Sequence, residues 1–417
     1  MPEAWLRAIW PAYNLAVAVI AFPILVLIAA AEGVRTRRRR ARGARPRLLW
    51  GPQAIIAIRD WSRGLQGLGY ESVTFADAVA RINRREDFDV HRNAFLPGVP
   101  RAELVRDYVV FVWALRRADV FSWYFNRGYL TYSGLAWLEC SLLHLAGKKI
   151  IVSPFGGDIA VVGEIGVIEP WLLQDYPELV DTSAAARRRI LHLCRHADLV
   201  IRNYQYGFLP RADVLWPTMI AIDTHQWDVV ERDDARADGH NGEVVVVHAP
   251  NHRAIKGTQQ LIDAIQQLQA EGLRVRLDLI EGRPNEEVRR AIQRADIVAD
   301  QFIAGYALFA IEGMSSGKPV VSALAWMPPE VAHTPALRAC PIVDTDLSNL
   351  VGNLRGLIKD PARRQELGRA GREFVLRYHA HEPVARTWSA LIEHVWAGSP
   401  LPAELTAPLR IAPVPSA

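Results

Sequence analysis

The chain has 417 residues, half of them hydrophobic, which is enough for two domains of ordinary size with a core each. Its formal net charge is only +4, and much of the basic excess lies near the N-terminus, which argues against nucleic acid as a partner. Three cysteines, Cys140, Cys194 and Cys340, are widely separated and form no CxxC pair, so they indicate neither a disulfide framework nor a structural zinc site.

An uncharged segment, residues 8–31, predicts a transmembrane helix, because crossing a bilayer takes about 20 apolar residues. A cleaved signal peptide is the alternative, but the region before the segment is short and not clearly basic. Eight arginines follow in a basic juxtamembrane segment, residues 35–47, and the positive-inside tendency keeps the body of the protein in the cytoplasm. We therefore expect a single-pass protein of the inner membrane. The arginines either only set this topology or also bind anionic lipid head groups.

Apolar β-rich runs alternate with helical patterns through residues 50–228. A first strand is expected at 53–58, and the later runs ADVFSWYF, SGLAWLECSLLHLAG and KKIIVSP read as strand, helix and strand. This alternation predicts a Rossmann-like, doubly wound N-terminal domain. The polar run 229–243 lacks the apolar content needed to pack and marks a hinge.

A second domain of the same α/β class is expected at 244–378. Its predicted strands are 244–249, 274–280, 296–299 and 318–322, and its predicted helices are 257–271, 285–294, 306–316, 347–358 and 361–378. A last helix follows within 379–397. The tail 399–417 is rich in proline and is expected to be poorly ordered.

The run VVVHAPNHRAIKG, from Val245 to Gly257, predicts an anion site. A buried strand ends in a polar loop that holds His248, Arg253 and Lys256, and a helix starts directly afterwards. In α/β domains such a loop places cations beside a helix N-terminus, where phosphate binds readily.

A second segment, GYALFAIEGMSSGKPVV from Gly305 to Val321, reads as a loop, a short helix and a buried strand. Together with the first run it resembles the donor-binding half of the retaining GT-B glycosyltransferases of group 1, or family 4. This large family includes sucrose synthases and bacterial mannosyltransferases. The pair Asp300–Gln301 before the glycine loop resembles a divergent branch with a DQ, GY, E and GKP pattern.

The resemblance implies two Rossmann-like domains facing across a cleft, with the last helix crossing back onto the first domain. It places the donor diphosphate against Arg253, Lys256 and the amides near Gly305 and Tyr306. It also implies that Glu312 binds the nucleotide ribose, as a carboxylate can accept from two vicinal hydroxyls. A catalytic role is expected for the two cations, because positioned cations stabilise the charge that develops on the leaving group.

Three positions leave alternatives open. The family's second glutamate, eight residues before Glu312, is Ala304 here, which puts the donor sugar and turnover in doubt. Asp300 either contacts the donor or caps the end of a strand. In SPFGGDIA, Gly156 and Gly157 on the acceptor side precede Asp158, which is either a catalytic residue facing the cleft or a helix N-cap.

No metal or other cofactor is predicted. The D-x-D spacings at Asp87–Asp89 and Asp344–Asp346 do not follow a strand end where a nucleotide-bound metal would lie. The sequence also lacks a Walker-type GxxxxGK, which argues against an NTPase.

These observations predict a membrane-anchored glycosyltransferase. It would transfer a sugar from a nucleotide-sugar donor to a lipid-linked or cell-surface polysaccharide acceptor, with retention of anomeric configuration as the resemblance implies. A catalytically inactive, nucleotide-binding scaffold at the membrane is the alternative. A membrane adaptor that works through the arginine run is a third possibility.

Overall fold

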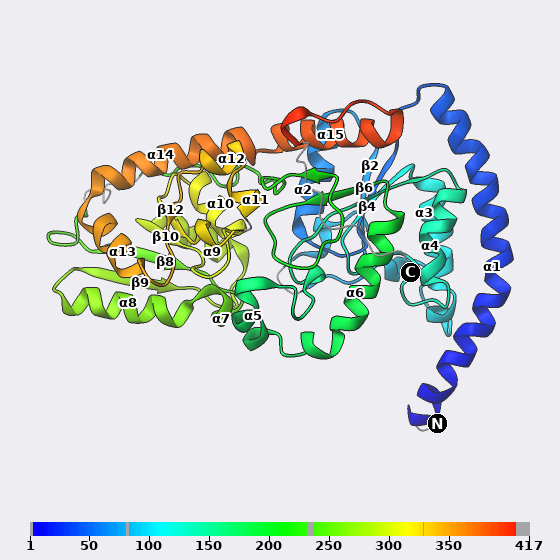
Figure 1. Ribbon diagram of the computed structural model, residues 1–417, viewed down its shortest axis with the longest axis horizontal. Helices are drawn as coiled ribbons and strands as arrows, with labels where there is room; N and C mark the ends of the chain where they lie inside the picture. The colour runs from blue at the N-terminus through cyan, green and yellow to red at the C-terminus, as the bar shows by residue number, and fades with distance from the viewer. Residues whose placement is uncertain (1–2, 81–82, 232–236, 328, 406–417) are drawn as a thin grey trace.

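The computed structural model describes residues 3–80, 83–231, 237–327 and 329–405. Two parallel sheets form two α/β units that lie side by side (Figure 1). This confirms the predicted α/β class. Parts of the predicted hinge and tail, residues 232–236 and 406–417, lie outside the described residues.

The N-terminal unit, the N-domain, has a seven-stranded sheet in the order β3-β2-β1-β4-β5-β6-β7, and every neighbouring pair is parallel. Its strands are β1 (Leu48–Trp50), β2 (Ser72–Ala76), β3 (Val90–His91), β4 (Val120–Trp123), β5 (Lys149–Val152), β6 (Leu199–Arg202) and β7 (Val214–Leu215). Its helices are α2 (Ile56–Gly67), α3 (Arg106–Arg117), α4 (Glu139–Leu145), α5 (Glu169–Asp175) and α6 (Leu179–His196).

The first strand differs from the prediction. The expected strand at 53–58 is wrong, because β1 lies earlier and helix α2 begins at Ile56. The buried residues Ile58, Trp61 and Leu65 recur at the spacing of one helix face, which outweighs the short apolar run that suggested a strand.

The C-terminal unit, the C-domain, has a five-stranded parallel sheet in the order β12-β11-β10-β8-β9. Its strands are β8 (Val244–His248), β9 (Val275–Leu279), β10 (Ile297–Ala299), β11 (Val320–Ser322) and β12 (Val343–Asp344). The helices are α7 (Arg253–Lys256), α8 (Thr258–Ala270), α9 (Asn285–Arg294), α10 (Leu308–Ser315), α11 (Pro329–Ala332), α12 (Pro335–Arg338), α13 (Leu350–Lys359) and α14 (Pro361–Tyr378). Strand β8 is buried along its whole length, as its unbroken apolar run favours in a parallel sheet.

The last helix, α15 (His381–Ala397), leaves α14 and packs on α2 of the N-domain, so the chain returns to its first unit (Figure 1). Trp388 of α15 is fully buried there. Its ring centroid lies 4.8 Å from that of Trp50, 5.0 Å from that of Trp61 and 5.4 Å from that of Trp216.

Helix α1 (Glu3–Ala41) is continuous over 39 residues. Its stretch Tyr13–Ala41 is long and apolar enough to cross a membrane, a property that a signal sequence or a buried core helix shares. The helix extends beyond the predicted 8–31 and includes the first arginines of the basic segment. It lies alongside α3 and α4 of the N-domain (Figure 1).

Candidate functional site

Three of the predicted donor residues meet beyond the carboxyl ends of the C-domain strands. Asp300 follows β10, and its Oδ1 accepts a hydrogen bond from Nζ of Lys256 at 2.9 Å. Its Oδ2 accepts from the amide of Ala307, at the start of α10, at 2.6 Å. Asp300 therefore joins Lys256 of α7 to the N-terminus of α10. Both contacts are made within the protein, so its carboxylate is held in place without a ligand.

Glu312, on α10, is buried close to this pair. Burial raises the pKa of its carboxyl to about 8, and the charge of Asp300 acts in the same direction. A hydrogen bond with the side chain of Asn285 and the charge of Lys256 oppose that rise. We call Lys256, Asp300 and Glu312 the acid–lysine cluster. A buried, perturbed carboxylate beside a lysine is the kind of group that functional sites contain.

Arg253 stands apart from this cluster. Its guanidinium forms two hydrogen bonds with the carboxylate of Glu281, at 2.8 and 3.1 Å, and its side chain is 52% exposed. The two cations that the sequence grouped together are therefore held by different carboxylates. Lys256 is buried in the cluster, whereas Arg253 lies in solvent beside the loop after β9.

His248 does not face a donor, contrary to the prediction. The ring has no exposed surface, Nδ1 lies 2.8 Å from the carbonyl of Ala299, and Nε2 lies 2.9 Å from Oγ1 of Thr258. Burial lowers the pKa of this imidazole to about 4, so it is neutral near pH 7. Because β8 is a central strand covered on both faces, its last side chain ties β10 to α8 instead of reaching a ligand.

The Gly305–Tyr306 loop was predicted to offer its backbone amides to a donor, and its tyrosine side chain makes contacts of its own. Tyr306 is fully buried, stacks on Tyr204 of the N-domain at 5.4 Å and has its hydroxyl 3.2 Å from Nε2 of His379. Gly305 adopts a φ of 41°, where a side chain is disfavoured, and its carbonyl accepts from Oγ of Ser322. The Tyr306 side chain therefore supports the contact between the domains. Only the backbone of this loop is left to contact a nucleotide-sugar donor.

Ala304 lies in an apolar contact between the domains. It packs against a buried cluster that combines Ile303 of the C-domain with Ala160, Ile165 and Ile168 of the N-domain. A glutamate carboxylate held against these aliphatic side chains would lose hydration, at a desolvation cost.

On the N-domain side, Asp158 organises loops at the carboxyl ends of β4 and β5. Its buried carboxylate accepts from the amides of Phe125, Phe155 and Gly156 at 3.1, 3.0 and 2.9 Å. Burial raises the pKa of this carboxyl to about 7, against the lowering effect of these amides. Gly157 begins the one-turn helix that contains Asp158. The carboxylate is thus engaged by backbone, as in a capping role, and Gly156 and Gly157 shape the same turn.

A carboxylate that the sequence did not single out contacts the predicted phosphate loop. Asp175, at the end of α5, accepts from the amide of Ile255 at 2.8 Å and, at 3.4 Å, from that of Ala254. Helices α5 and α7 therefore meet across the two domains. Asp175 is the last residue of a short helix that carries no motif, so no sequence pattern marked it.

Carboxylates of the protein therefore occupy both cations that were predicted to hold a diphosphate, and also two amides that lie between these cations in the chain. Asp300 holds Lys256, Glu281 holds Arg253, and Asp175 holds the amides of α7. A phosphate binds the same donors as a carboxylate does, so these contacts identify groups with the right chemistry. The contacts also mean that a nucleotide sugar must share these groups with the three carboxylates or displace the carboxylates.

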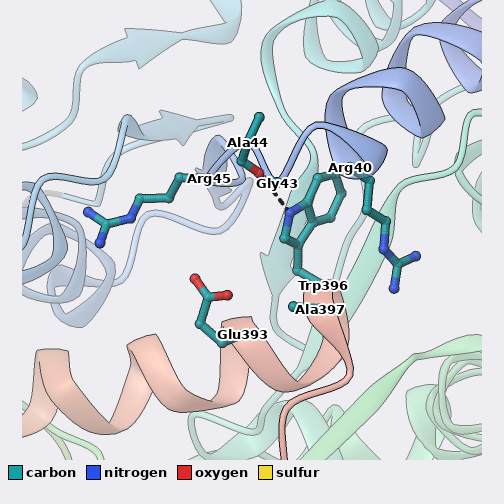
Figure 2. Close-up of a pocket in the computed structure, with 7 residues that line it drawn as sticks. All are labelled: Arg40, Gly43, Ala44, Arg45, Glu393, Trp396 and Ala397. Carbon is teal, nitrogen blue, oxygen red and sulfur yellow. Dashed lines mark hydrogen bonds between the residues drawn. The ribbon is translucent and has the colours of Figure 1, made fainter.

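Two cavities lie outside this region. One, of about 420 Å³, is bounded by the end of α1 and by α15, with Arg40, Arg45, Glu393 and Trp396 among its lining residues (Figure 2). There the indole of Trp396 donates to the carbonyl of Ala44, and the guanidinium of Arg40 lies 5.5 Å from its ring (Figure 2).

The other cavity, of about 340 Å³, lies beyond β2 and β3, and its lining includes Asp77, Asn83, Arg85 and His91. Neither cavity is lined by the acid–lysine cluster.

Within the described ranges, no group of three His, Cys, Asp or Glu side chains is placed to hold a metal ion. The D-x-D carboxylates have other contacts: Asp87 pairs with Arg59 at 2.7 Å, Asp89 accepts from Thr74, and Asp344 accepts from the amide of Ala325. These aspartates serve local structure in the described part of the chain.

Comparison of the sequence with protein-family models and with curated proteins gave no match. Comparison of the structure shows the GT-B fold. A sucrose-phosphate synthase from Thermosynechococcus elongatus superposes with a TM-score of 0.53 and 16% identity, covering 85% of this chain and 100% of that one. HepE from Anabaena, solved with UDP-glucose, gives a TM-score of 0.50 and 13% identity, covering 85% of this chain and 100% of that one. An α-glucosyltransferase solved with UDP and DNA gives a TM-score of 0.52 and 12% identity, covering 84% of this chain and 100% of that one. At these identities the likeness concerns the fold.

Proposed function

We propose that this chain is a nucleotide-sugar-dependent glycosyltransferase that acts at a membrane. The acid–lysine cluster carries this proposal, because it puts a buried cation and a buried acidic side chain, which we propose contacts the ribose, together where ligands bind in open α/β sheets. GT-B structures solved with UDP-glucose or UDP share the fold and support a nucleotide-sugar donor.

In this proposal Lys256 stabilises the diphosphate as it gains charge on leaving, and Glu312 accepts hydrogen bonds from the ribose hydroxyls. Arg253 swings from Glu281 to the diphosphate, which its exposure permits. Asp158 holds the acceptor-side loops through the backbone amides that it binds. Retention of anomeric configuration rests on the sequence resemblance. Helix α1 keeps the enzyme at the inner membrane, with its body in the cytoplasm and near a lipid-linked or polysaccharide acceptor.

The test is the release of nucleotide from a panel of sugar nucleotides by detergent-solubilised protein, with and without membrane-lipid extract as acceptor. We expect one donor to give release that depends on the acceptor. Absence of release with every donor would contradict the enzyme assignment.

A non-catalytic scaffold is the second candidate, and the apolar surroundings of Ala304 favour it. A scaffold would bind one nucleotide in calorimetry yet release none in the same panel. The matched control is Ala304→Glu, which restores the family's usual residue. Gain of release by this variant alone would assign the natural chain to the scaffold class.

A further inference from the structure

Helix α1 has two apolar faces, and the structure gives them different surroundings. Ala18, Leu25 and Ala29 are buried in the N-domain core. On the other side Ile20, Ile24 and Leu27 are 68%, 54% and 72% exposed. From sequence alone, a helix that is apolar on all sides is predicted to span a membrane. In this structure, however, one apolar face is already buried against protein.

The docked face extends over most of the predicted span. Asn14 donates to the carbonyl of Tyr132, Gly33 lies so close to the backbone of Leu145 that a Cβ there would meet its carbonyl oxygen at 2.4 Å, and Thr36 is buried. From Ala18 to Thr36 the helix rises by about 27 Å at 1.5 Å per residue. This length is close to the hydrocarbon thickness of a bilayer, about 30 Å.

Polar contacts fix the basic end of α1 to the same domain. Asp119, fully buried before β4, pairs with Arg39 at 3.3 Å and with Arg47 at 3.0 Å. If the docked helix crossed a bilayer, the loop around Tyr132, which Asn14 contacts, would be submerged too, together with the ion pair of Arg127 and Asp77 that the Tyr132 hydroxyl contacts. Irregular backbone and charges of this kind do not face hydrocarbon.

The outward face changes from apolar to basic along the helix. Ile20, Ile24, Leu27 and Val34 lie on this face at spacings of three, four or seven residues, and they are followed by exposed Arg38 and, just beyond the helix, by exposed Arg42. An apolar stripe that continues into arginines matches acyl chains bordered by anionic head groups. Exposed Trp137, next to α4, adds an aromatic residue of the type enriched at membrane interfaces.

We propose that α1 lies along the membrane instead of crossing it. Its inner face is the docking face for the N-domain, and its outer face, Ile20 to Arg38, is immersed in one leaflet of an anionic bilayer. This arrangement explains why the segment is apolar on all sides. It rests on the membrane attachment in the proposed function but not on the sugar-transfer chemistry.

Substituted cysteines at the two ends of α1 test the orientation in the full chain. Glu3→Cys and Arg42→Cys are made in a Cys340→Ser background, since Cys140 and Cys194 are buried. A membrane-impermeant maleimide is applied to spheroplasts and to inverted inner-membrane vesicles. We expect both positions to react in inverted vesicles and neither in spheroplasts. Labelling of Glu3→Cys in spheroplasts only would establish a span and overturn the proposal.

A second experiment tests the outer face itself. Purified Ile20→Glu/Leu27→Glu protein is floated with vesicles of equimolar phosphatidylglycerol and phosphatidylcholine. We expect at least a tenfold loss of vesicle-bound protein, with an unchanged circular dichroism spectrum. The matched control is Val180→Glu on α6, a residue 59% exposed and away from α1, which should bind as the natural chain does.

Unchanged vesicle binding by the double variant would overturn the proposal. If that variant kept its vesicle binding but lost self-association, the outer face of α1 would be assigned to contact with a second copy of the chain. Since neither assay uses a sugar donor, a failed donor panel leaves their outcome unaffected.

Discussion

At the scale of single residues, the ion pair of the acid–lysine cluster is buried, whereas the ion pair of the neighbouring Arg253 is exposed. Lys256 and Asp300 form a buried ion pair, in which removal of one partner leaves an uncompensated charge. Arg253 forms an exposed pair with Glu281, of a kind that contributes little to stability. Substitutions at these two cations should therefore separate folding from catalysis.

Lys256→Ala should slow sugar transfer at least tenfold, about 1.4 kcal/mol of transition-state stabilisation. It should also lower the free energy of unfolding by about 3 kcal/mol, because Asp300 stays buried without its partner. Urea denaturation and steady-state rates on folded protein measure the two effects. Arg253→Ala is the control: we expect a slower rate with unchanged stability. An unchanged rate in folded Lys256→Ala protein would remove this lysine from the site.

Glu312→Gln should change how stability depends on pH. Burial raises the folded-state pKa of Glu312 from its usual 4.5 to about 8, so between these values the folded state binds the extra proton. Stability contributed by the protonated form is therefore present at low pH and declines as the pH rises to about 8. The glutamine variant should lose this decline. Unfolding curves at pH 5, 6.5 and 8 compare the two proteins, and identical slopes would contradict the raised pKa.

At the scale of elements, helix ends decide how the two domains meet. The short α7 carries Lys256 at its end and has its first amides bound to Asp175 of α5, whereas α10 begins at an amide bound to Asp300. Two acidic residues thus occupy helix N-termini that would otherwise attract a phosphate. The α5–α7 contact is made by residues from different domains, so it also limits how far the domains separate.

Asp175→Ala should weaken this contact and free the α7 amides. Loss of the cap should lower the free energy of unfolding by about 1 kcal/mol. Removal of a negative charge from the α7 amides should also tighten UDP binding, as measured by calorimetry. Glu178→Ala, an exposed acid three residues further on, is the matched control. Weaker UDP binding by Asp175→Ala than by the control would contradict competition between this carboxylate and a diphosphate.

At the scale of the whole molecule, α15 makes the N-domain depend on the C-terminal end of the chain. Its Trp388 completes a group of indoles contributed by β1, α2 and the segment after β7. Helix α1 covers another part of the same domain, next to α3 and α4. The N-domain therefore needs both ends of the chain, and truncation at either end removes part of its packing.

Trp388→Ala should destabilise the N-domain by about 4 kcal/mol, because it removes a fully buried indole and leaves a cavity. Near-ultraviolet circular dichroism should lose the signal of the coupled indoles, and the urea midpoint should fall. The exposed Trp137→Ala serves as the control and should leave the midpoint nearly unchanged. Equal midpoints for the two variants would contradict a structural role for the α15 contact.

The sequence by itself determined the α/β class, since buried parallel strands such as β8 are continuous apolar runs whose pattern is local. It also marked the segments that meet in the acid–lysine cluster, because loops after parallel strands converge on one edge of the sheet. Only the tertiary structure decided that His248 is buried, that Asp175 reaches α7 and that Ala304 faces aliphatic neighbours. It also placed one face of α1 against the N-domain. Each of these depends on which distant residues become neighbours, and no local spacing of apolar or charged residues encodes that.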